Sequence, residues 1–173
     1  HKNKNEYLIN INSSIKFSKD EIGSSISCSG VCLTLVNFKQ KISKFYISKE
    51  TLNRTNFKYL KNKTIINLEK SLKYGNRISG HFVQGHIDTT SKILSISSVG
   101  KSWYIDFNLP KKYRKFIIEK GSIAINGVSL TIAKKLKKMF RVVVIPQTLK
   151  YTNLIKLQKG DIVNIEFDIL SKY

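Results

Sequence analysis

Hydrophobic and polar residues alternate in two short stretches of the chain, residues 30–35 (GVCLTL) and 127–132 (GVSLTI). In both, aliphatic side chains are separated by Cys, Ser or Thr, the period of two that sends neighbouring side chains to opposite faces of a β-strand. We expect one face to pack in a core and the other to carry small polar groups. Further strands, separated by short Gly, Asn and Lys turns, are predicted over 44–48, 64–69, 92–97, 103–109, 140–145 and 161–169.

Helical signals are few. We predict one interior helix that begins near Pro110 and ends before Gly121, with its apolar side chains on one side. A shorter helix over 18–23 is its expected counterpart earlier in the chain. Many short strands with one short helix per half are typical of an all-β protein built from two small barrels in tandem.

The chain contains an internal repeat. Gly127 follows Gly30 by 97 positions, and no gap is needed to align the residues from Gly30 to Glu69 with those that follow Gly127. Of the 40 aligned pairs, 13 are identical, more than composition alone would give. The same offset relates three pairs of motifs: GVCLTL with GVSLTI, ETLNRTN (50–56) with QTLKYTN (147–153), and IINLE (65–69) with IVNIE (162–166).

The repeat defines the expected domain organisation. Residues 1–81 form a first barrel and residues 82–173 form a second, homologous barrel. Because both copies carry similar polar segments, the duplication predicts two similar pockets for two similar ligands.

Composition and charge restrict the class of protein. The chain has 173 residues, of which 41% are hydrophobic, enough for one ordinary domain or two small ones. The formal net charge of +20 raises nucleic-acid binding as a hypothesis. The lysines are spread over the whole length, with clusters only at 111–115 and 134–138, which favours a solvated surface and no nucleic-acid partner.

The cysteines and the apolar runs indicate the compartment. Cys28 and Cys32 lie four residues apart in a predicted strand, so their Cα atoms would be roughly 13 Å apart, too far for a disulfide. Free thiols indicate a reducing compartment. No apolar run approaches the roughly eighteen residues that span a bilayer, and the first residues do not resemble a signal peptide. We therefore expect a cytoplasmic protein that does not associate with membranes.

The segment GHFVQGHIDTT (80–90) places His81 and His86 five residues apart beside Asp88. This spacing fits no common zinc motif, so we expect no metal. A catalytic histidine and a purely structural one both remain open from the residues alone.

Taken together and in order, the motifs SCSGVCLTL, KETLNRTN, GHFVQGHIDTT, KGSIAINGVSLTI, IPQTLKYTNL and GDIVNIEFD resemble the riboflavin synthase family of tandem lumazine-binding barrels. The resemblance covers the chain from about Gly23 to Tyr173. It implies the dismutation of two molecules of 6,7-dimethyl-8-ribityllumazine by transfer of a four-carbon unit, giving riboflavin and 5-amino-6-(ribitylamino)uracil. It implies no metal or organic cofactor, a homotrimer with its site between barrels of neighbouring subunits, and association with lumazine synthase as a further hypothesis.

The reaction needs removal of a methyl proton, a nucleophile, and hydrogen-bond donors for the resulting anions. The resemblance assigns His86 as the candidate base or proton relay and Cys32 as nucleophile or donor. It assigns Ser129, at the repeat position of Cys32, as a donor, with Asp168 as a carboxylate that positions Ser129 and the ligand. His81 is expected to orient backbone or to pack. Small residues on a crowded strand remain the structural alternative.

The resemblance also implies a set of substrate-binding residues. Most lie in or beside the two alternating strands, at the strand ends 46–51 and 143–148, or in the GH segment. The set also includes one lysine. They are Ser25, Val31, Leu33, Thr34, Tyr46, Ile47, Ser48, Lys49, Glu50, Thr51, Gly85, Ile87, Lys120, Val128, Leu130, Thr131, Val143, Val144, Ile145, Pro146, Gln147 and Thr148.

The chain departs from the family at its ends and at single positions. The family begins with a Met-Phe-Thr-Gly segment and a first strand, and it ends in a helix that helps to hold the trimer. We expect this sequence to lack the first segment, most of the first strand and the final helix. Ser29 stands where the family commonly has Asn.

Two other function classes predict different residues. Lumazine proteins of the same fold bind lumazine or flavin without catalysis, but they tend to lose the histidine and threonine that correspond to His86 and Thr131, which are present here. An oligonucleotide-binding barrel would need aromatic residues interleaved with lysine on one sheet face, and no such stripe is found.

Overall fold

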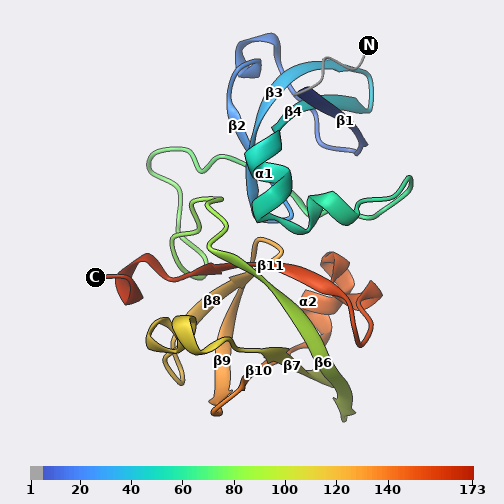
Figure 1. Ribbon diagram of the computed structural model, residues 1–173. Helices are drawn as coiled ribbons and strands as arrows, with labels where there is room; N and C mark the ends of the chain where they lie inside the picture. Colours follow the sequence, from blue (N-terminus) through green and yellow to red (C-terminus); the bar gives the residue numbers. More distant parts are fainter. Residues whose placement is uncertain (1–5) are drawn as a thin grey trace.

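The computed structural model describes residues 6–173, which form two stacked β units (Figure 1). An extended segment, residues 71–88, joins them and is called the linker. The first unit is a five-stranded antiparallel sheet in the order β1-β4-β3-β2-β5. Its strands are β1 (Glu6–Asn12), β2 (Ser25–Cys28), β3 (Val31–Lys39), β4 (Ile42–Ser48) and β5 (Leu68–Lys70).

The second unit is a closed antiparallel barrel in the order β10-β7-β6-β11-β8-β9. Its strands are β6 (Thr89–Val99), β7 (Ser102–Asn108), β8 (Ser122–Ile125), β9 (Val128–Lys135), β10 (Met139–Val144) and β11 (Ile162–Phe167). The predicted tandem all-β architecture is confirmed.

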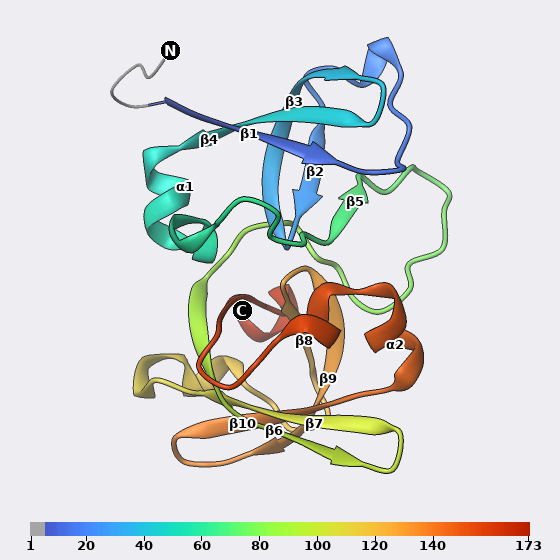
Figure 2. The same ribbon diagram turned by 90° about the vertical axis from the view of Figure 1, so that its right-hand side faces the viewer.

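The two units differ in closure. In the second unit, β6 pairs with both β7 and β11 and completes the ring. The repeat counterparts of β7 and β11 are β1 and β5, and within residues 6–173 no strand joins these two, so the first sheet is open (Figure 2). Of the two predicted barrels, the second unit is therefore a closed barrel, and the first is an open sheet within the described residues.

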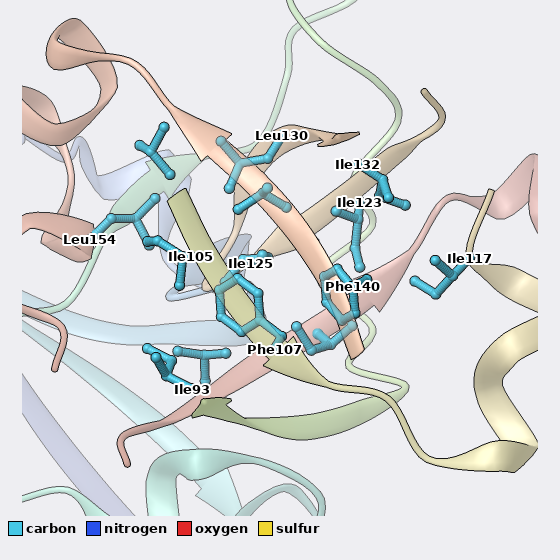
Figure 3. Packing of buried hydrophobic residues seen from close by; sticks show 14 of the residues in the cluster. Ile93, Ile105, Phe107, Ile117, Ile123, Ile125, Leu130, Ile132, Phe140 and Leu154 are labelled. Atoms are coloured by element: carbon cyan, nitrogen blue, oxygen red, sulfur yellow. The ribbon is translucent and has the colours of Figure 1, made fainter. Parts of the chain in front are cut away.

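Each unit has its own core of alternating side chains. In the second unit, Phe107 and Phe140 stack with ring centroids 5.2 Å apart among fully buried isoleucines and valines (Figure 3). In the first, Leu35, Phe45 and Ile47 are fully buried. Burial of each such side chain contributes about 2 kcal/mol. The division of the chain at residues 81 and 82 stays a prediction.

The helix predictions were partly wrong. The chain over 110–121 forms only a 3₁₀ turn, η3 (Lys111–Phe116), whose Tyr113 and Phe116 rings pack 5.4 and 5.3 Å from the Phe167 ring. The expected counterpart over 18–23 is the 3₁₀ turn η1 (Lys19–Glu21).

The two α-helices follow β4 and β10, where strand ends were expected. They are α1 (Lys49–Arg54) and α2 (Pro146–Tyr151), and each continues into a 3₁₀ turn, η2 (Asn56–Tyr59) and η4 (Asn153–Lys156). The Ser48 hydroxyl accepts the Thr51 N–H and caps α1, and Pro146 opens α2.

The predicted strand over 64–69 is short in the structure. The Thr64 hydroxyl closes a turn on the backbone of Lys61, and Lys63 adopts a φ of +67°. Pairing begins only at Leu68, where β5 joins β2.

The interface between the units is a reciprocal asparagine network that obeys the repeat. The Asn164 side chain accepts the Asn56 N–H at 2.7 Å and donates to the Ser29 carbonyl at 3.0 Å. Asn67, the repeat counterpart of Asn164, accepts the Asn153 N–H at 2.7 Å and donates to the Asn126 carbonyl at 3.0 Å. The two units are therefore related by an approximate twofold axis.

That axis passes between two hairpin turns. Ser29 and Gly30 both have positive φ, as do Asn126 and Gly127, so both turns have the conformation that favours Asn-Gly. A Cβ atom on Gly30 would lie 2.7 Å from the Gly127 nitrogen, and one on Gly127 would lie 2.7 Å from the Gly30 nitrogen. Only glycine allows this approach.

Within the described part of the chain, no helix has the length and apolar character needed to cross a membrane.

We predict that Asn164→Ala lowers the free energy of unfolding by about 2–4 kcal/mol, because it leaves the Asn56 N–H and the Ser29 carbonyl without their partners in a buried place. The matched control is Asn67→Ala at the half-buried repeat position, where water can replace the lost bonds and the cost is smaller. Urea unfolding measures both. Equal costs would contradict a network that depends on burial.

We predict that Ser29→Asn raises the free energy of unfolding by about 0.5 kcal/mol or more. Asn tolerates the positive φ of 46° better than Ser, and Asn126 shows that its amide oxygen can accept the neighbouring strand's N–H at 2.9 Å. Ser29→Ala, which removes the acceptor of the Asn67 N–H, should be destabilising instead. Thermal melting of the three proteins checks the order.

Candidate functional site

A cleft of about 800 Å³ lies between the two units and the linker. Its walls include side chains from both hairpins, β2–β3 and β8–β9, so it touches both copies of the repeat. Six predicted or neighbouring site residues line it: Ser25, Cys32, His81, Gly85, Val128 and Ser129.

The first wall is the polar face of the β2–β3 hairpin. Register pairs Ser25 with Thr34 and Ser27 with Cys32, so these small polar side chains share one region of the sheet. Cys32 is half-buried, whereas Cys28 is fully buried and its pKa is raised by burial and by the nearby Cys32. Both cysteines are free, as predicted. The reactive candidate is therefore Cys32.

The linker lies directly on Cys32. The Gly85 carbonyl accepts the Cys32 N–H at 2.9 Å, and a Cβ atom on Gly85 would lie 2.7 Å from the Cys32 Cβ. Gly85 also has a φ of +81°. A side chain at this position would displace the linker from the first unit.

The same linker lies on Ser129 through a second glycine. A Cβ atom on Gly80 would be 2.5 Å from the Ser129 Oγ, and the adjacent His81 Nδ1 is hydrogen-bonded to that Oγ at 2.7 Å. Burial lowers the pKa of His81, opposed by the charge of Asp168, so the imidazole is neutral near pH 7. The two repeat-equivalent residues Cys32 and Ser129 are thus covered by one segment, 80–85.

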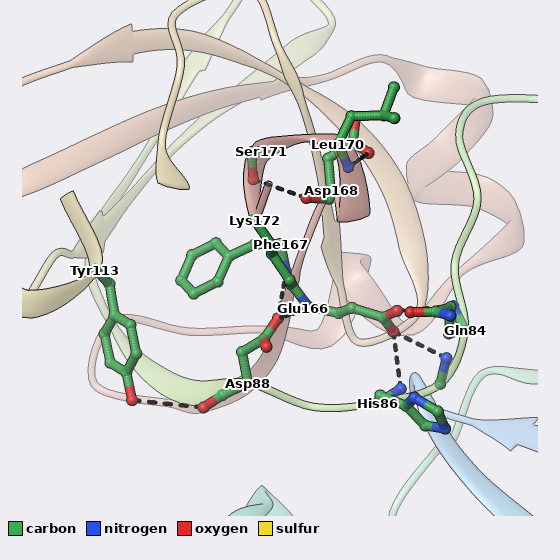
Figure 4. A network of polar contacts seen from close by, with 11 residues as sticks. Gln84, His86, Asp88, Tyr113, Glu166, Phe167, Asp168, Leu170, Ser171 and Lys172 are labelled. Carbon is green, nitrogen blue, oxygen red and sulfur yellow. Dashed lines mark hydrogen bonds and ion pairs between the residues drawn. The ribbon is translucent and has the colours of Figure 1, made fainter. Parts of the chain in front are cut away.

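A buried carboxylate holds the linker at His86. Glu166 of β11 accepts the backbone N–H groups of Gln84, Gly85 and His86 at 2.7, 2.9 and 3.1 Å (Figure 4). Glu166 is only 2% exposed. Burial raises the pKa of Glu166, and the three N–H groups together with the charge of Lys172 oppose that rise.

Asp168 is not hydrogen-bonded to Ser129 in the described part of the chain, although its charge acts on the neighbouring His81. Its carboxylate accepts the Leu170 N–H and caps the last 3₁₀ turn, η5 (Ile169–Ser171) (Figure 4). The Ser129 hydroxyl is bonded to His81. Asp88 accepts the Phe167 N–H at 2.8 Å and pairs with Lys172 at 2.7 Å. Among the described residues, His81 is thus the side chain bonded to Ser129, and the role of Asp168 stays a prediction.

The remaining predicted residues fall into two groups. The side chains of Val31, Leu33, Ile47, Leu130 and Val144 are buried in the two cores, so any ligand contact there would be through backbone groups.

The others are exposed or half-buried. The residues of this second group are Thr34, Tyr46, Ser48, Lys49, Glu50, Thr51, His86, Ile87, Lys120, Thr131, Val143, Ile145, Pro146, Gln147 and Thr148. His86 is exposed and is not among the residues that line the cleft. The roles of the whole set stay predictions.

Sequence reasoning missed two residues of this site. His81 was expected to pack or to orient backbone, and the signal that could have found it was its place after Gly80 in the GH pair. Glu166 was noticed only as the end of the IVNIE repeat motif; its three N–H partners are 80 to 82 residues away and leave no local pattern.

The chain is similar to known proteins over most of its length. The family model of the lumazine binding domain matches residues 1–71 and 84–168. The chain is 38% identical over 173 residues to a riboflavin synthase of Actinobacillus pleuropneumoniae, covering 100% of this chain and 80% of that relative. It is 41% identical over 150 residues to a riboflavin synthase of Chlamydia trachomatis serovar D, covering 87% and 73%.

Solved structures of similar fold carry ligands of one chemical kind. LumP complexed with riboflavin superimposes with a TM-score of 0.82 at 26% identity, covering 96% of this chain and 91% of that one. LumP complexed with 6,7-dimethyl-8-(1'-D-ribityl) lumazine gives a TM-score of 0.80 at 25% identity, covering 95% and 89%.

We predict that an aromatic disulfide reagent labels one thiol of the native protein rapidly and the second only after unfolding. Cys32 is the accessible thiol, and burial with a raised pKa protects Cys28. Absorbance of the released thiolate counts the reacted groups. Cys32→Ser should abolish the rapid phase; rapid labelling that persists in this variant would contradict the assignment.

Proposed function

We propose that this chain, which belongs to the riboflavin synthase family of lumazine-binding enzymes, dismutates two molecules of 6,7-dimethyl-8-ribityllumazine. A four-carbon unit passes from one molecule to the other, giving riboflavin and 5-amino-6-(ribitylamino)uracil. Donor and acceptor are the same compound, and the atoms of the two products equal those of the two substrates, so the overall equation needs no further reactant.

One observation carries the proposal: Cys32 and Ser129 occupy the same position in the two repeats, and one linker segment covers both. Two similar polar surfaces suit two identical ring systems. The two surfaces themselves differ, because one presents the Cys32 thiol and the other the Ser129 hydroxyl. Such a difference lets one bound molecule be attacked while the other is deprotonated.

The proposed roles follow from the chemistry of the groups. His86 removes or relays the methyl proton of the donor, since a histidine can accept and return a proton near neutral pH. Cys32 acts as nucleophile or donor in the first unit. The Ser129 hydroxyl, oriented by His81, donates to the anion that develops in the second unit.

The proposed assembly is a homotrimer in the cytoplasm. His86 is exposed in the single chain, which suits a site completed by a neighbouring subunit. Two free cysteines suit a reducing compartment. Association with lumazine synthase is a further proposal.

The second candidate is a carrier that binds lumazine or flavin without converting it. The similarity in fold to LumP complexed with riboflavin favours this possibility. The presence of both His86 and Thr131, with identities of 38% and 41% to the riboflavin synthases above, favours catalysis.

We predict that the purified protein, with no cofactor added, forms riboflavin from 6,7-dimethyl-8-ribityllumazine. His86→Ala should lower the turnover about 100-fold, the usual size of a general acid–base contribution. Cys32→Ser introduces the residue of the second repeat and should lower it at least about 10-fold, because the thiol is lost while a small donor remains. Absorbance of riboflavin measures the rates.

Glu119→Gln serves as the control, since Glu119 is exposed on the second unit and accepts only the Lys135 N–H. It should turn over like the wild type. Lumazine that binds to the wild type, measured by its fluorescence, but is never converted would replace the enzyme with the carrier.

A further inference from the structure

The carboxylate of Glu166 is satisfied by backbone alone. Three consecutive N–H groups of the linker, those of residues 84–86, share its two oxygens, with the Gln84 N–H on Oε1 and the other two on Oε2. Figure 4 shows the side chain reaching from β11 to this turn of the linker. Successive N–H groups that converge on one point form an anion-binding nest.

No basic side chain pairs with this carboxylate. Among residues 6–173 the ion pairs involve other acids, and Lys172, whose charge lowers the pKa of Glu166, is itself paired with Asp88 at 2.7 Å. A buried carboxylate is costly, and an apolar side chain at this position would avoid that cost. The feature that Glu166 supplies and an apolar residue cannot is a fixed position for three specific N–H groups.

The fixed segment touches both units. Gly85 donates its N–H to Glu166 of the second unit, and its carbonyl accepts the Cys32 N–H of the first unit at 2.9 Å. Gly85 is buried, and a Cβ atom built on it would lie 2.7 Å from the Cys32 Cβ of β3. The backbone of His86 is thus held in two ways. Its N–H donates to Glu166, and the preceding residue, Gly85, is bonded to Cys32.

We propose that Glu166 is a positioning residue: it holds the His86 backbone at a fixed place relative to Cys32 by accepting the three linker N–H groups. This role rests on the proposed function for the catalytic part of His86, but the anchoring itself does not. Glu166 is not among the residues that line the cleft, and its contribution to the rate acts through His86.

The test variant is Glu166→Gln, which keeps the size of the side chain. A glutamine offers one oxygen and one NH₂ group, so at least one of the three N–H groups would face a donor. We expect amide hydrogen exchange at residues 84–86 to accelerate at least about 10-fold, the effect of losing a charge-assisted hydrogen bond. Exchange in β9, in the same barrel, should remain as in the wild type and shows that the barrel is folded.

Activity gives the second readout. Glu166→Gln should lower kcat about 10-fold or more and leave KM within about threefold, because the ligand contacts are not removed. In a His86→Ala background the same change should have little further effect, since the group being positioned is gone. Glu119→Gln, which also loses a carboxylate that accepts a backbone N–H, should change neither exchange at 84–86 nor kcat.

The outcomes separate two failures. Unchanged exchange at residues 84–86 in Glu166→Gln would overturn the anchoring. Faster exchange in Glu166→Gln, together with a kcat in the Glu166→Gln/His86→Ala double variant that falls by the product of the two single losses, would show that Glu166 does not act through His86. If the wild type does not convert lumazine but exchange at residues 84–86 is faster in Glu166→Gln, the proposed function is overturned and the anchoring by Glu166 stands.

Discussion

The reciprocal hydrogen bonds of Asn67 and Asn164 are the constraint on which the arrangement of the molecule depends. Each asparagine side chain accepts a backbone N–H from the 3₁₀ turn of the other unit and donates to a backbone carbonyl of that unit's hairpin, and these backbone groups would otherwise be unsatisfied. Because Asn164 is fully buried, its bonds admit little change in position. The approach of Gly30 to Gly127 then brings the two hairpins, and the residues that follow them, to one side of the linker.

The linker converts this packing into a site. It has to pass from β5 to β6, and on the way it lies on Ser129 through Gly80 and on Cys32 through Gly85. Both contacts need a residue without a Cβ, and Gly85 also needs a positive φ. The glycines set how closely the chain follows the two strands, while His81 and Glu166 determine the positions at which it is held.

The parts of the fold that sequence predicts are those with local patterns. Alternation in 31–35 and 128–132 predicts β3 and β9 because the signal and the structure both have a period of two. The helices α1 and α2 are six residues each, too short for a helical period, and their capping residues were assigned to strand ends. The bonds of Ser129 to His81 and of Glu166 to residues 84–86 join segments far apart in sequence, so only the folded chain reveals them.

The covalent link between the two repeats has an evolutionary consequence. In a symmetric homodimer, every substitution appears on both sides of the axis, so a residue at the equivalent sites cannot differ between them. Here the pairs that hold the units together, such as Asn67 with Asn164, have remained the same, while Cys32 and Ser129 have diverged. Fusion of the copies thus separates inheritance of the interface from inheritance of the polar residues beside it, and a single gene can change each half independently.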